Sequence, residues 1–89
     1  MSPHSDLPLL VETALGRHVP FDDATPSELW SYAITLMQRS IQEAKDAVET
    51  ADEDGRSAVT DELMRMSTEH SAQANALLAH LTERLRKPE

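Results

Sequence analysis

The fold of this chain is decided by residues 25–55, which read TPSELWSYAITLMQRSIQEAKDAVETADEDG. Residues 25–28 form a helix-start signal, in which threonine is the N-cap, proline takes the first turn and glutamate reaches back to the cap. Gly55 suits the left-handed backbone conformation that closes a helix. We therefore expect one long helix over residues 26–52 and an acidic turn over residues 52–56.

The apolar residues of this long helix recur in steps of four and three, which is the heptad spacing of helices that pack along their length. The bulky members come first and the small ones last: Trp30, Ile34, Met37, Ile41, Ala44, Val48 and Ala51. We expect this stripe to face a neighbouring helix, with the closest approach at its alanine end.

A second long helix is expected over residues 57–86, where Ser57 can serve as its N-cap. Its apolar stripe also advances in steps of three and four: Val59, Leu63, Met66, His70, Ala74, Leu77, Leu81 and Leu85. Because the link between the two helices is short, they should lie side by side and antiparallel.

The N-terminal segment is expected to form a short helix over residues 6–15. Its apolar residues repeat with helical spacing: Leu7, Leu10, Val11, Ala14 and Leu15. Gly16 would end this helix, and residues 16–25 would connect it to the next one. The sequence thus predicts a single all-α domain over residues 1–89, with a short N-terminal helix and a long antiparallel helical hairpin.

A homodimer follows from the dimensions of this hairpin. Each long helix would measure roughly 40 Å, and the N-terminal helix would cover only about a third of that length. Small chains bury little surface, so a second copy that completes a four-helix bundle is the expected remedy. The alternative is a monomeric three-helix domain with a protruding tip.

Composition narrows the classes of partner. Sixteen acidic residues against eight basic ones give a net charge of −8, which opposes binding to nucleic acid or to anionic lipid. Residues 43–62 hold eight acidic and two basic residues and so carry −6 of that charge. Cysteine is absent, and no apolar run approaches the roughly 20 residues of a membrane span. We expect a cytoplasmic protein with neither a membrane nor a nucleic-acid partner.

His70 is the candidate for an interior site, because it interrupts the apolar stripe with Glu69 and Gln73 nearby. One interpretation is a ligand or metal site inside the bundle. However, Glu69 directly precedes His70, whereas helical di-iron sites use Glu-x-x-His. The simpler interpretation is a half-buried histidine that hydrogen-bonds to a partner helix and sets the register. No cofactor is expected.

All three aromatic residues lie within residues 21–32. Phe21 and Trp30 have the size to seal one end of a bundle, whereas Tyr32 lies off the stripe and should be the more exposed of them. Exposed tryptophan and tyrosine often anchor protein interfaces, so Trp30 and Tyr32 are also candidate partner-binding residues.

The function expected from these features is that of a small protein-interaction module, acting as an adaptor, a regulator or an assembly factor. Its partner would bind the aromatic end or the acidic tip formed by Asp52, Glu53 and Asp54. One alternative is a metal- or ligand-binding bundle around His70, and another is an acidic inhibitor that mimics nucleic acid. An enzyme is not expected, because no nucleophile, acid and base can be placed together.

Overall fold

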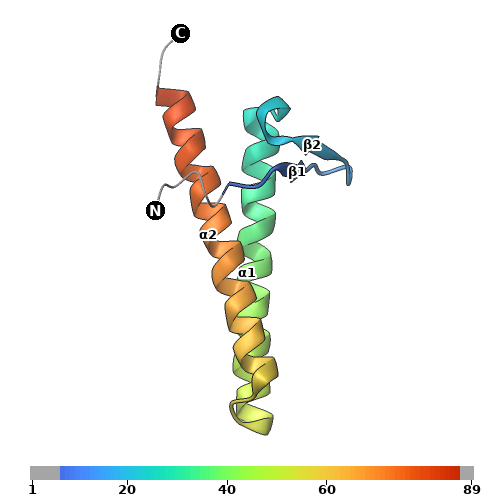
Figure 1. Cartoon of the computed structure of the whole chain (residues 1–89), viewed down its shortest axis with the longest axis vertical. Coiled ribbons are helices and arrows are strands. Elements are labelled where there is room, and N and C mark those ends of the chain that lie inside the picture. Colours follow the sequence, from blue (N-terminus) through green and yellow to red (C-terminus); the bar gives the residue numbers. More distant parts are fainter. Residues whose placement is uncertain (1–6, 87–89) are drawn as a thin grey trace.

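A computed structural model describes residues 7–86 and consists mainly of two long helices that run antiparallel, side by side (Figure 1). Helix α1 spans Pro26–Asp54 and helix α2 spans Ala58–Arg86. With 29 residues, each helix is about 43 Å long. The predicted helical hairpin is confirmed, and the helix ends lie within two residues of the predicted ends.

Local signals define both ends of α1. The Thr25 N–H donates to Glu28 Oε1 at 2.9 Å, and the Glu28 N–H donates to Thr25 Oγ1 at 3.1 Å, so the capping box is complete. Gly55 has φ +76° and closes the helix, as its lack of a side chain allows. At the start of α2, the Thr60 N–H donates to Ser57 Oγ at 3.4 Å. The turn between the helices is therefore set by capping residues that the sequence makes visible.

The expected N-terminal helix over residues 6–15 is wrong, although residue 6 itself lies outside the described part of the chain. Instead, strand β1 (Leu10–Glu12) pairs antiparallel with strand β2 (His18–Pro20). The expected connector over residues 16–25 contains β2 and one turn of 3₁₀ helix, Phe21–Asp23. The fold is therefore mostly helical with a short β-hairpin, and not all-α.

The turn of this β-hairpin explains the difference. Gly16 has φ +80°, and its N–H donates to the Thr13 carbonyl at 2.9 Å, while the Thr13 N–H donates to the Arg17 carbonyl at 2.8 Å. A helix of ten residues is marginal on its own. The β-hairpin instead sets Val11 opposite Val19 and buries Val11 completely, so packing prevails over helical periodicity.

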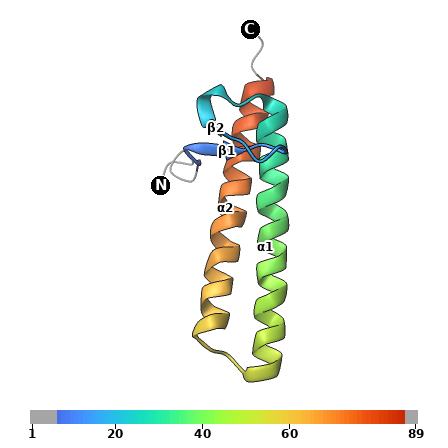
Figure 2. The same cartoon turned by 90° about the vertical axis from the view of Figure 1, so that its right-hand side faces the viewer.

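The hydrophobic core lies at the open end of the helical hairpin, where the β-hairpin crosses both helices (Figure 2). One cluster joins all the elements there: Val11, Ala24, Leu29, Ala33, Leu36, Ala74, Leu77 and Leu81. Toward the closed end, the buried residues of the two helices are small or polar, namely Ser40, Ala47, Thr60 and Ser67. The two halves of the rod are therefore held together by different kinds of contact.

The predicted orientation of α1 is also wrong. Its buried residues lie one position before the predicted stripe: Leu29, Ala33, Leu36, Ser40 and Ala47. Three of the residues expected to face α2 are largely exposed, with Trp30 at 54%, Ile41 at 64% and Val48 at 59%. On α2, Ala74, Leu77 and Leu81 are buried as predicted, whereas Val59 and Leu85 are exposed.

Candidate functional site

One face of the helical hairpin, here called the covered face, carries the β-hairpin. Arg39 on α1 lies 3.6 Å from Glu12 on β1, and the ring of His80 on α2 lies 4.8 Å from that of Phe21. Arg39 thus contacts the β-hairpin, and His80 contacts the 3₁₀ turn that follows it. The N-terminal segment therefore covers one side of the helix pair and leaves the other side uncovered by any described element.

The opposite face, here called the bare face, has no described element lying on it. Trp30 of α1 lines one hollow of about 390 Å³ together with Leu78 and Leu85 of α2, so these residues share a side of the molecule. Extending both helices from that point by heptad steps defines the face: Trp30, Ile34, Met37, Ile41, Ala44, Val48 and Ala51 on α1, and Met64, Thr68, Ser71, Asn75, Leu78, Thr82 and Leu85 on α2. The stripe expected to face α2 is thus the α1 half of an open surface.

These 14 positions contain no charged residue, and the next heptad step on α2 is Asp61, which lines a hollow together with Met64 and Thr68. Since 27% of the chain is charged, about four of the 14 positions would be charged if residues were distributed evenly. The corresponding positions on the other flank of the two helices do include charges: Glu28, Arg39, Asp46, Glu49, Glu62, Glu69 and Glu83. An uncharged, largely apolar face of this extent is typical of an interaction surface.

Trp30 and Tyr32 exchange the exposures expected of them. Trp30 is more than half exposed, whereas Tyr32 is half-buried and packs on the core. The cause is the one-residue shift of the buried stripe, which turns Trp30 toward the bare face and Tyr32 toward the core. Phe21 packs on the core as expected. Of the three aromatic residues, Trp30 alone is exposed.

Between the helices, a serine pair forms the middle of the contact. Ser40 Oγ donates to the Ser67 carbonyl at 2.8 Å, and Ser67 Oγ donates to the Ser40 carbonyl at 2.8 Å. A hydroxyl can reach the backbone of the other helix only where the two helices approach closely. Both side chains are buried, so this pair holds the helices at a short separation.

A larger side chain in place of Ser67 should push the two helices apart. We expect Ser67→Leu to lower the free energy of unfolding by about 1–3 kcal/mol, because the added carbons overpack the contact and the hydroxyl bonds are lost. Ser71→Leu, the same change at a half-buried position on the bare face, is the control and should cost less. Urea denaturation of the two variants measures the difference, and equal losses would contradict the close approach.

His70 lies one turn beyond the serine pair and faces the other helix. Its Nδ1 is 2.7 Å from Glu43 Oε1, with 25% of the His70 side chain and 14% of the Glu43 side chain exposed. Gln73 lies one turn away and is half-buried, whereas Glu69 pairs with Arg65 on the outside of α2. The structure therefore joins His70 to Glu43, which the apolar pattern of the sequence does not mark, and separates it from Glu69.

The metal-site interpretation of His70 gains nothing from this geometry. Within residues 7–86, no group of three or more histidine, cysteine, aspartate or glutamate residues could hold a metal ion. A ligand site at His70 stays a prediction. The hydrogen bond to Glu43 is consistent with the simpler interpretation, in which a histidine sets the register of two helices.

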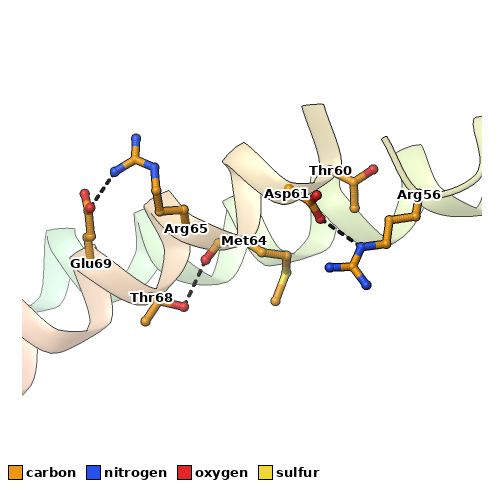
Figure 3. Close-up of a pocket in the computed structure, with 7 residues that line it drawn as sticks. All are labelled: Arg56, Thr60, Asp61, Met64, Arg65, Thr68 and Glu69. Atoms are coloured by element: carbon orange, nitrogen blue, oxygen red, sulfur yellow. Dashed lines mark hydrogen bonds and ion pairs between the residues drawn. The ribbon is translucent and has the colours of Figure 1, made fainter. Parts of the chain in front are cut away.

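The outer surface of α2 carries an ion-pair network beside a shallow hollow of about 570 Å³ (Figure 3). Arg65 binds both Glu62 and Glu69, and Arg56 binds Asp61 at 2.9 Å. The hydrogen bond from Arg65 holds the pKa of the Glu62 carboxyl below its ordinary value. Met64 lies among these charges but belongs to the bare face, and 46% of it is exposed.

The acidic tip is exposed where α1 ends, with Asp52, Glu53 and Asp54 open to solvent. Among residues 7–86, neither helix is long and apolar enough to cross a membrane.

No family model, curated protein or solved structure matches this chain.

Proposed function

We propose that this chain is a protein-interaction module, acting as an adaptor, a regulator or an assembly factor, and that the bare face is its working surface. The observation that carries the proposal is the uncharged stripe of heptad spacing on α1, of which Trp30, Ile34, Ile41 and Val48 are exposed and the remaining residues are half-buried. Monomeric proteins rarely expose large contiguous apolar patches, because such surfaces favour association or aggregation.

The spacing of the stripe also indicates the shape of the partner. Apolar residues at steps of four and three form knobs that fit the holes of a facing helix. A flat ligand or a strand would not match this periodicity. The partner surface is therefore expected to be helical, with an apolar stripe of its own.

Placing a photo-reactive amino acid on each side of α1 tests the proposal. Benzoylphenylalanine in place of Ile41 lies on the bare face, whereas the same residue in place of the exposed Gln42 lies off it. We expect covalent protein adducts several-fold more abundant at position 41 when each variant is expressed in the organism that makes this protein. Adducts at neither position, or equal adducts at both, would contradict the proposal.

A further inference from the structure

We infer that the bare face is covered by a second copy of this chain, packed antiparallel so that α1 meets α1 of the partner in a register centred near residue 39. This inference rests on the proposed function, because it names the partner of the same surface. It also specifies the bundle geometry, which the heptad spacing by itself leaves open.

The size of the face suits a stable dimer. From Trp30 to Ala51 the stripe is about 31 Å long, and two helices side by side are roughly 20 Å wide, which gives a projected area of about 600 Å². The accessible surface of corrugated helices exceeds this projection. It is therefore comparable to the roughly 800 Å² that each partner buries in a standard protein interface.

The taper of the stripe makes it complementary to itself when it is reversed. In the proposed register, Trp30 meets Val48 of the partner, Ile34 meets Ala44 of the partner, and Met37 meets Ile41 of the partner. Each layer thus combines a large residue with one of equal or smaller size. Alternation of this kind fills the space between helices evenly, whereas a parallel pairing of α1 with α1 would place two Trp30 side chains in one layer.

The hollow at the open end of the helical hairpin provides space for side chains of the second copy. It is lined by Trp30, Leu78 and Leu85, and its volume is about 390 Å³. In the antiparallel dimer, the narrow end of the partner's stripe, with Val48 and Ala51, approaches this hollow. The large side chains that line the hollow of one copy then lie opposite the small residues at the end of the other copy's stripe.

Charge selects between the two twofold arrangements open to a hairpin. With the axis along the bundle, α1 would pack on the partner's α2, and the two segments at residues 43–62, each carrying −6, would lie at the same end. With the axis across the bundle, α1 packs on α1 and these segments lie at opposite ends of a rod about 43 Å long. That length is several times the Debye length of about 8 Å at physiological salt, so the repulsion is screened.

Cysteine cross-linking tests the arrangement, because the chain has no cysteine of its own. Ile34→Cys and Ala44→Cys variants are mixed, allowed to exchange subunits and oxidised. We expect about tenfold more disulfide-linked dimer in this mixture than in either variant alone, since two copies of position 34 would be about 15 Å apart along the bundle and a disulfide needs Cα atoms within about 7 Å. Ala44→Cys mixed with Gln42→Cys, on the other flank of α1, is the control and should stay at the background level.

The other outcomes decide against the inference. Efficient cross-linking of Ile34→Cys with Asn75→Cys, and not with Ala44→Cys, would show α1 on the partner's α2 and overturn the antiparallel packing. Sedimentation of the unmodified chain should give twice 9.9 kDa at about 100 µM, where a dimer of micromolar Kd is largely formed. A 9.9 kDa species there would overturn the dimer whatever the variants do.

The two proposals can fail separately. A monomer in sedimentation, together with an adduct of position 41 to a different protein, would leave the interaction module standing and remove the second copy as its partner. A monomer without adducts at position 41 would remove both.

Discussion

Leu36→Ala should lower the free energy of unfolding by about 2–5 kcal/mol, because it removes a large side chain from the core and leaves a cavity. Leu36 is 1% exposed and belongs to the cluster that joins both helices to the β-hairpin. At about 0.1 kcal/mol per residue, an 89-residue chain has roughly 9 kcal/mol of stability, so this change removes a quarter to a half of it. Urea denaturation followed by circular dichroism measures the loss.

Ile41→Ala is the matched control, since it truncates an aliphatic residue of the same helix that is largely exposed. In a dilute, monomeric sample it should change the stability by only about 0.5 kcal/mol, as surface substitutions do. At concentrations where a dimer forms, the same variant should be distinctly less stable than the unmodified chain. A large loss at every concentration would instead place Ile41 in the core of the single chain.

The second large effect is expected at the Glu43–His70 pair. His70→Leu removes the hydrogen-bond partner of the mostly buried Glu43 carboxyl, and we expect it to cost about 1–3 kcal/mol. Breaking a fully buried ion pair costs about 3–5 kcal/mol, and both side chains here keep some contact with solvent. The double variant Glu43→Leu, His70→Leu should recover most of the loss, because well-packed apolar residues often replace such a pair without cost.

A double-mutant cycle measures this coupling through the unfolding free energies of the unmodified chain, the two single variants and the double variant. Two single variants as stable as the unmodified chain would show that the 2.7 Å contact contributes nothing to stability. A double variant less stable than His70→Leu would show that the pair is required for packing.

Much of the candidate site follows from the sequence once the orientation of α1 is known. The stripe from Trp30 to Ala51 is visible as a heptad pattern, and its expected role in packing helices becomes a role between chains in our proposal. An apolar pattern does not mark Glu43, because it is charged, yet it belongs to a second series in steps of four and three: Leu29, Ala33, Leu36, Ser40, Glu43, Ala47 and Thr50. That series contains the residues that face α2.

Periodicity does not select between these adjacent series, because each has heptad spacing and they differ by one residue, or about 100° around the helix. The more apolar series is the natural choice from composition. The other one is buried because its leucines pack with Leu77, Leu81 and Val11, and because the serine pair lets the helices approach closely. Both reasons depend on residues far away in the sequence.

The sequence alone determined the two long helices, the turn between them and the charge of the tip, since capping residues, Gly55 and acidic composition act through neighbours along the chain. The tertiary structure decided which stripe of α1 is buried and turned the first segment into a β-hairpin. Those outcomes depend on burial shared among distant segments: Val11 gains a complete core environment in the β-hairpin, and the uncharged stripe beginning at Trp30 is left open to a partner.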